Sequence, residues 1–148
     1  MPKKKNSRRK RKTTKPVICP YCESPAELVD STEVYQQDYD KKLWLCRPCD
    51  AYVGTHRHSE HHAPLGTLAN ATLRQLRLKV HQTFDPLWLR KMQQEDMPKQ
   101  AARTAGYQWL ASEMGIKAKH CHIAHFNETQ CEQVLKLCQP YADRLQKN

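Results

Sequence analysis

Four of the seven cysteines form two Cys-x2-Cys pairs, and this spacing is the strongest chemical signal in the chain. Cys19 and Cys22 form the first pair, Cys46 and Cys49 the second, with 23 residues between the pairs and a proline inside each. Each pair makes a tight turn that aims two sulfurs at one point, and its backbone amides can donate hydrogen bonds to the thiolates. Four converging thiolates suit Zn²⁺ at ~2.3 Å per sulfur, with no coordination position left open. The spacing therefore predicts a zinc ribbon that holds one structural Zn²⁺.

Two other uses of the four cysteines have weaker support. A thioredoxin-like redox pair needs one Cys-x2-Cys at the start of a helix, whereas both pairs here lie among predicted strands. Iron in a rubredoxin-like four-thiolate site remains an alternative to zinc. An odd number of cysteines and the absence of a secretory signal argue against a fully paired disulfide framework.

Cysteine and histidine cluster a second time, near the start of the last predicted helix. Cys131 and Cys138 share a helix face with apolar residues, and we interpret them first as small buried side chains. The alternative is a second metal site or structural cluster formed by Cys121, His122, Cys131 and Cys138. A nucleophile and base at Cys121 and His122 is less favoured, because adjacent residues seldom point at each other and no third orienting group is visible. We therefore assign no catalytic residue.

A run of histidines follows the second cysteine pair. It contains His56, His58, His61 and His62. Such a run can bind a metal, but we interpret it as a solvated polar loop.

The net charge of +10 is concentrated in the first 15 residues, which contain no acidic residue. The other 133 residues carry 16 basic and 15 acidic residues, so the body of the protein is almost neutral. We expect a disordered basic arm over 1–15 that contacts the phosphates of nucleic acid. Its basic residues are Lys3, Lys4, Lys5, Arg8, Arg9, Lys10, Arg11, Lys12 and Lys15.

The hairpin between the cysteine pairs offers a second surface for nucleic acid. Aromatic side chains stack on unpaired bases, and basic side chains contact phosphates. The candidates are Tyr35, Tyr39, Lys41, Lys42, Trp44 and Arg47.

Strands are predicted around the two cysteine pairs, and helices are predicted in the rest of the chain. Strand-forming residues occupy 26–35, 43–45 and 51–54. Helical periodicity begins after Asn70, and Pro86 is expected to end that helix near Phe84. A second helix covers 99–113 with Gly115 as its cap. A third begins at Glu128 behind an Asn127–Gln130 capping pair and is expected to end at Pro140, with a short last turn after it.

The predicted fold is α+β: an N-terminal four-cysteine zinc ribbon, made of a β-hairpin and a short strand, followed by a small bundle of about three helices. The expected organisation is 1–15 basic arm, 16–55 zinc ribbon, 56–66 His-rich connector and 67–148 helical region. No apolar run approaches the ~18–20 residues that span a bilayer, so no membrane partner is expected. Without a secretory signal, the cytoplasm is the expected location, or the nucleus in a eukaryotic source.

The order and spacing of several short motifs resemble a zinc-finger-containing domain family of bacteria and their phages. The likeness covers roughly residues 17–138 and leaves the basic arm outside. It implies a zinc-binding module of a phage or bacterial protein and no particular activity, and it gives more weight to Cys121-His122. The motifs are Cys19-Pro20-Tyr21-Cys22, the segment 46–54, the segment 64–69, His81 with 84–88, the segment 107–111, and Cys121-His122-Ile123 with Phe126 and Cys131.

Three functions are compatible with the sequence. The favoured one is non-enzymatic binding of DNA or RNA. The alternative is a protein-interaction or adaptor module that acts on a host protein, which the near-neutral body favours. A metal-dependent nuclease that uses His56, Cys121, His122 or His125 is less favoured, because no Asp/Glu/His catalytic constellation is visible.

Overall fold

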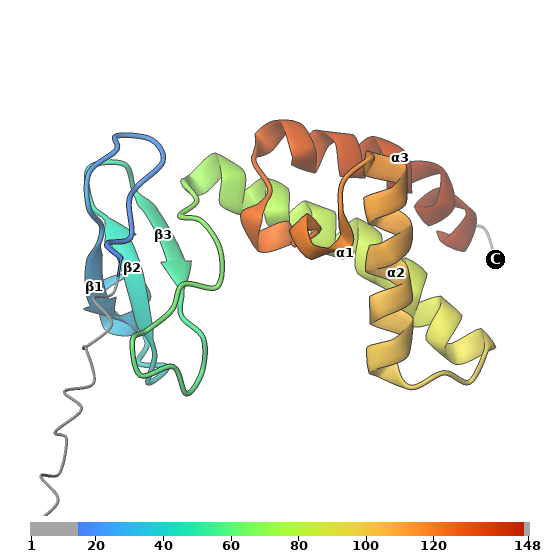
Figure 1. Ribbon diagram of the computed structural model, residues 1–148, viewed down its shortest axis with the longest axis horizontal. Helices are drawn as coiled ribbons and strands as arrows, with labels where there is room; N and C mark the ends of the chain where they lie inside the picture. Colours follow the sequence, from blue (N-terminus) through green and yellow to red (C-terminus); the bar gives the residue numbers. More distant parts are fainter. Residues whose placement is uncertain (1–14, 147–148) are drawn as a thin grey trace, which may run out of the picture.

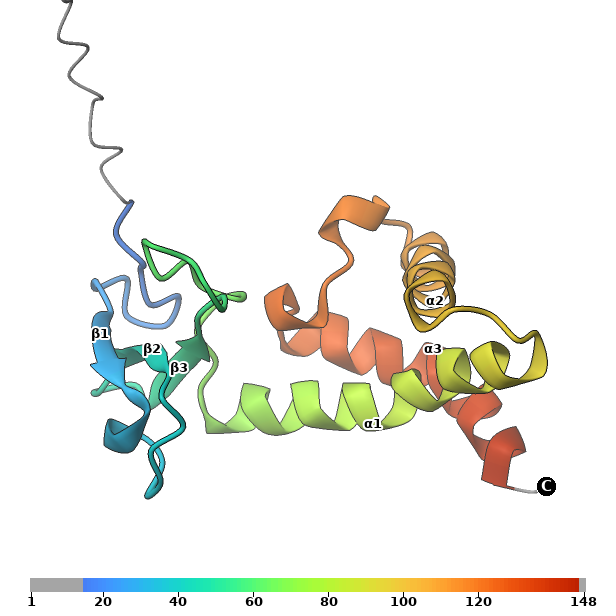
Figure 2. The same cartoon turned by 90° about the horizontal axis from the view of Figure 1, so that it is seen from below.

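The computed structural model describes residues 15–146, in which a small sheet precedes three helices, so the α+β prediction is confirmed (Figure 1). The sheet occupies one end of the molecule, and α1 leads away from it into the helical part (Figure 2). The elements are β1 (Glu27–Asp30), the 3-10 turn η1 (Ser31–Glu33), β2 (Lys42–Cys46), β3 (Ala51–Gly54), α1 (Ala71–Gln94), α2 (Lys99–Met114), the 3-10 turns η2 (Ala118–His120) and η3 (Ile123–His125), and α3 (Glu128–Gln146).

The sheet is antiparallel with β2 in its centre. Leu28 pairs with Trp44, and Trp44 pairs in turn with Val53. Because side chains alternate between the two faces of a strand, Leu43 and Leu45 lie on one face and Trp44 on the other. The Leu43 face packs with Val29, and the Trp44 face packs beside the cysteines.

The first strand is shorter than predicted. It ends at Asp30, because Ser31 starts a turn and does not continue the ladder. The buried Ser31 hydroxyl accepts a hydrogen bond from the amide of Tyr39 (3.0 Å), and the Ser31 amide donates to the carbonyl of Lys41 (2.8 Å). These contacts close the loop between β1 and β2 and place Tyr35 and Tyr39 in it.

The predicted end of the first helix at Phe84 is wrong. The helix α1 continues through Pro86 to Gln94. An interior proline costs a helix about 3 kcal/mol, but Phe84 and Trp88 are both buried on the same side of α1, and each such side chain contributes about 1.5–3 kcal/mol. The indole of Trp88 also donates to the carboxylate of Asp85 (3.1 Å). Tertiary packing thus outweighs the local effect of the proline.

The predicted end of the third helix at Pro140 is also wrong. Helix α3 runs unbroken to Gln146, with Pro140 exposed, and directly after the proline Tyr141 packs edge to face on Trp109 of α2 at 5.4 Å. Its start agrees with the prediction. The Gln130 amide donates to the side chain of Asn127 (2.9 Å), and the Asn127 amide donates to the side chain of Gln130 (3.0 Å).

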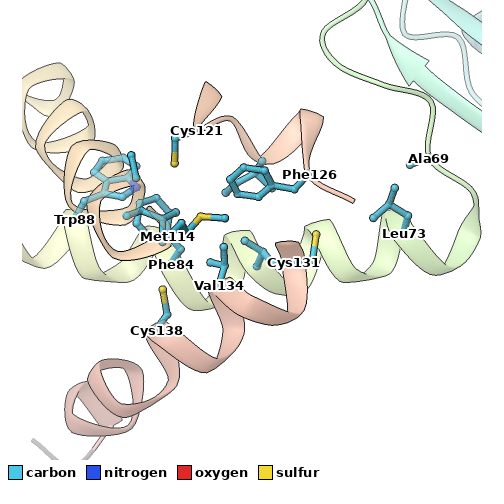
Figure 3. Packing of buried hydrophobic residues seen from close by; sticks show 14 of the residues in the cluster. Ala69, Leu73, Phe84, Trp88, Met114, Cys121, Phe126, Cys131, Val134 and Cys138 are labelled. Atoms are coloured by element: carbon cyan, nitrogen blue, oxygen red, sulfur yellow. The ribbon is translucent and has the colours of Figure 1, made fainter. Parts of the chain in front are cut away.

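The helices enclose one apolar core, to which all three contribute (Figure 3). Gly115 ends α2 in the left-handed conformation (φ 71°, ψ 30°), as predicted. The helix face predicted for α1 is buried at Leu73, Val80 and Phe84, and Leu76 packs against it. Helix α1 therefore both contacts the sheet at its start and contributes buried side chains to the helical core.

Several hydrogen bonds join the sheet to the start of α1. The backbone of Ala69 pairs with that of Tyr52 in both directions (3.0 and 3.1 Å). The guanidinium of Arg74 donates to the carbonyl of Asp50 (2.6 Å) and lies 3.2 Å from its carboxylate. The two halves of the molecule are therefore attached at residues that follow the second cysteine pair.

Candidate metal centre

The thiols of Cys19, Cys22, Cys46 and Cys49 converge at one point, with all four sulfurs within 4.8 Å of one another. The first two cysteines lie in the turn before β1; of the second two, Cys46 ends β2 and Cys49 lies in the turn between β2 and β3. The turns meet because β1 pairs with β2. The sulfurs of Cys22 and Cys46 lie 3.6 Å apart.

This geometry fits a tetrahedral zinc ion. Four sulfurs at ~2.3 Å from a common centre lie about 3.8 Å from one another, which is close to the observed separation of 3.6 Å between Cys22 and Cys46. Cys19 is fully buried and Cys46 nearly so, whereas Cys22 faces solvent. The four cysteines would hold one Zn²⁺, which crosslinks the two turns and leaves no position for a substrate.

Hydrogen bonds to the sulfurs and burial shift the pKa values of the cysteines in this site. Backbone and hydroxyl hydrogen bonds from Ser24, followed by a bond from Cys46, lower the pKa of Cys22 to about 6. Burial, with hydrogen bonds from neighbouring thiols, raises the pKa of Cys49 to about 12. In the metal-free site the thiolate of Cys22 is therefore favoured, whereas the raised pKa of Cys49 keeps that thiol protonated until a cation binds.

The second Cys/His cluster is not brought together as a metal site. Within residues 15–146, the first four cysteines form the only group of three or more converging ligands. Cys121, Cys131 and Cys138 are buried among apolar side chains, dispersed through the helical core (Figure 3). His122 is exposed, and its ring lies edge-on to that of His125, with 6.1 Å between the ring centroids. The interpretation of Cys131 and Cys138 as small buried side chains agrees with this placement.

The thiol of Cys121 is poorly suited to nucleophilic chemistry. Burial raises its pKa to about 11, so the thiolate is scarce at neutral pH. Desolvation by burial, together with the charges of His122 and Arg77, lowers the pKa of His125. The structure thus offers no activated thiolate beside these histidines.

The histidine run folds back over the sheet as a loop. His56, His58 and His61 are exposed, while the carbonyl of His62 accepts a hydrogen bond from the indole of Trp44 (2.7 Å). The His56 amide donates to the carbonyl of Ala63 (2.8 Å), which closes the loop.

The predicted nucleic-acid residues fall into three groups. Lys3, Lys4, Lys5, Arg8, Arg9, Lys10, Arg11 and Lys12 lie outside the described residues. Lys15, Lys41 and Lys42 are exposed, and Lys42 pairs with Asp30. Arg47 pairs with Glu33 (3.2 Å) and lies 3.6 Å from Glu27, so its charge is largely compensated.

Trp44 does not belong to the same surface as the tyrosines. It is half-buried on the cysteine side of the sheet, whereas Tyr35 and Tyr39 lie with Tyr52 on the opposite side. Tyr52, Arg74 and Arg77 also line the tyrosine side, although none of them was predicted to do so. The alternation of side chains along a strand could have placed Tyr52 on this side of the sheet. No local sequence pattern predicts that α1, which carries Arg74 and Arg77, begins beside it.

No helix in the described part of the chain has the length and apolar character needed to cross a membrane. A family model described as a zinc-finger-containing domain matches residues 15–141. Searches of curated proteins and of solved structures gave no significant match. The family match covers the sheet with its four cysteines, α1 and α2, and α3 as far as residue 141.

Proposed function

The chain belongs to the zinc-finger-containing domain family, and from this premise we propose that it binds nucleic acid without catalysing a reaction. The observation that carries the proposal is the concentration of nine basic residues and no acidic residue in 1–15, next to the zinc module. The last of them, Lys15, is exposed and lies four residues before Cys19. A basic segment attached to a folded domain adds phosphate contacts that do not depend on base sequence.

A closed metal site supports a binding role over an enzymatic one. Four thiolates complete the coordination of Zn²⁺, whereas a catalytic zinc keeps one position for water or substrate. The buried Cys121 thiol, with its pKa raised to about 11, is a poor nucleophile. Incubation with radiolabelled DNA and RNA across divalent metals tests this view. Cleavage that is lost in His122→Ala would replace the proposal with a nuclease.

Salt dependence tests the contribution of the arm. We expect the affinity of the full chain for duplex DNA to fall steeply between about 50 and 200 mM salt, with log K decreasing by ~0.9 per log salt for each phosphate neutralised. Removal of residues 1–15 should flatten this slope. A scrambled arm of the same composition is the matched control and should restore it. An unchanged slope in the truncated protein would contradict the proposal.

Protein interaction is a second candidate function, favoured by an apolar groove of about 530 Å³ where α1, α2 and α3 meet. Trp88, Trp109 and Tyr141 line it, and Trp109 and Tyr141 pack edge to face at 5.4 Å. Its charged lining residues, Arg90, Lys91 and Arg144, are all basic. An acidic amphipathic segment of a host protein would match this combination.

A pull-down after nuclease treatment separates the two candidates. A specific protein partner should be retained by the wild type and lost in Arg144→Glu, because this change reverses a charge at the groove. Lys79→Glu, at an exposed position of α1, is the control and should retain the partner. Loss of every captured protein after nuclease treatment would favour nucleic-acid binding alone.

A further inference from the structure

A groove of about 580 Å³ lies between the tyrosine side of the sheet and the start of α1. Residues far apart in the sequence form it, since the loop before β2, strand β3 and helix α1 each contribute. It combines three aromatic side chains with four basic ones and has no acidic residue in its lining. We call it the tyrosine groove; its aromatic and basic residues are Tyr35, Tyr39, Lys41, Lys42, Tyr52, Arg74 and Arg77.

The three tyrosines form a continuous aromatic surface. The ring of Tyr35 packs edge to face against Tyr39 at 5.5 Å and against Tyr52 at 6.0 Å. The guanidinium of Arg74 covers the Tyr52 ring at 4.0 Å. Tyr39 is 51% exposed and Tyr35 is 39% exposed, so ring surface remains available to a ligand. Two exposed aromatic rings at right angles present both a face and an edge.

Two of the cations in the groove have no carboxylate partner within residues 15–146. Lys42 pairs with Asp30 and Arg74 with Asp50. The guanidinium of Arg77 instead donates to neutral oxygens, the carbonyls of Thr67 (2.9 Å) and Phe126 (2.9 and 3.1 Å) and the hydroxyl of Thr67 (2.6 Å). These bonds fix the position of Arg77 without cancelling its charge. Lys41 is exposed and forms no ion pair in this part of the chain, although it also lines a neighbouring hollow with Asp38 and Asp40.

We propose that the tyrosine groove binds a short stretch of single-stranded nucleic acid, with bases stacked on Tyr35 and Tyr39 and phosphates held near Lys41 and Arg77. This inference rests on the proposed function and deepens it by naming the site and the form of the ligand. A ligand that matches the groove must be anionic and must offer flat apolar surface. Unpaired nucleotides offer both, whereas the bases of a duplex are already stacked on one another.

The test measures fluorescence anisotropy of labelled probes with the full, zinc-loaded chain. The probes are oligothymidylate and oligouridylate of about 12 nucleotides, within the site sizes of single-strand binders, an abasic strand of the same length, and a duplex. Tyr39→Ala should weaken binding of the two base-containing strands about 5- to 160-fold, as expected for the loss of one stacking platform. It should leave binding of the abasic strand and the duplex unchanged. Preference for oligothymidylate or oligouridylate tells DNA from RNA.

Lys41→Ala separates phosphate contacts from stacking. It should weaken binding of both the oligothymidylate and the abasic strand and reduce the salt slope by about 0.7 for one lost phosphate contact. Lys136→Ala, at an exposed position of α3 away from the groove, is the matched control and should bind as the wild type does. Because Tyr39 is half exposed, its truncation is expected to leave the fold intact, and zinc stoichiometry and circular dichroism of the variant check this.

The outcomes distinguish failure of the groove from failure of the function. If Tyr39→Ala and Lys41→Ala bind every probe as the wild type does, the groove is not the site, while nucleic-acid binding through the arm stands. If the full chain binds no probe at low salt, both are overturned. Photo-crosslinking of a halogenated oligouridylate to Tyr35, Tyr39 or Tyr52 would support the groove directly.

Discussion

The amide of Thr67 donates a hydrogen bond to the carbonyl oxygen of Ala124, 3.0 Å away. This contact joins the segment that leaves the sheet to the turn that precedes α3. It requires a close approach, because a Cβ on the neighbouring Gly66 would lie 2.0 Å from the same oxygen. The side chain of Arg77 joins the same two segments, because its guanidinium donates hydrogen bonds to the carbonyls of Thr67 and Phe126.

Substitution of this glycine should separate the two segments. Gly66→Ala is expected to lower the free energy of unfolding by about 1–3 kcal/mol, the usual effect of overpacking, because the obstructing atom is backbone and cannot rotate away. Chemical denaturation measures the change. Gly54→Ala is the control, since its Cβ meets the exposed end of Leu65 at 3.2 Å, and the change should stay within about 0.5 kcal/mol. Equal stability of the two variants would contradict the proposed steric cause.

The chain should hold one zinc ion. Native mass spectrometry is expected to show one Zn²⁺ per chain, none in Cys46→Ser under mildly acidic conditions, and one in Cys131→Ala. Removal by a chelator should unfold the sheet, because zinc in such sites supplies roughly 10–16 kcal/mol of apparent folding free energy. Two zinc ions in the wild type would indicate a second site that the described residues do not form.

The affinity for zinc should increase with pH. Cys22, with its pKa lowered to about 6, is mostly thiolate at pH 7, whereas Cys49, with its pKa raised to about 12, still carries a proton. Zinc binding must therefore release protons, and mass action weakens it as the pH falls. Competition with a chromophoric chelator between about pH 6 and pH 8 measures this dependence, because protons compete with zinc for the cysteine sulfurs. A pH-independent affinity would contradict these protonation states of Cys22 and Cys49.

The seven thiols should react in two stages. With zinc bound, no thiol is expected to react with a disulfide reagent at pH 8, because zinc covers four of them and burial protects the others. Burial raises the pKa of Cys121 and of Cys138 to about 11 and also raises that of Cys131. A chelator should expose the four thiols of the metal site, and a denaturant all seven. Rapid reaction of Cys121, Cys131 or Cys138 in the native, zinc-loaded protein, located by mass mapping, would show that the helical core opens.

The capping pair at the start of α3 should contribute measurably to stability. Asn127→Ala removes the acceptor for the Gln130 amide and is expected to cost about 1 kcal/mol. Gln130→Ala leaves that cap in place and should cost less. Thermal or urea unfolding monitored by helical circular dichroism compares the two. An equal loss from both variants would mean that the side chains stabilise the turn by another route.

The features of this protein that depend on neighbouring residues could be predicted from the sequence alone. Cysteine spacing predicted the metal site, because two short turns joined by a hairpin bring four sulfurs together in almost any context. Asn70, Asn127 and Gly115 marked helix ends correctly, because a cap depends only on the first or last turn of its own helix. The α+β class followed from the change of periodicity along the chain.

Tertiary structure decided what local patterns cannot. Pro86 and Pro140 lie inside helices, because contacts made beyond each proline outweigh the loss of one hydrogen bond: Trp88 is buried in the shared core, and Tyr141 packs on Trp109. Trp44 belongs to the cysteine side of the sheet, because the pairing register fixes the face of every side chain on β2. The tyrosine groove exists only because Arg74 and Arg77, on a helix that begins 17 residues after β3, pack beside that sheet. Contacts between distant segments depend on the whole packing arrangement, and no stretch of sequence encodes them by itself.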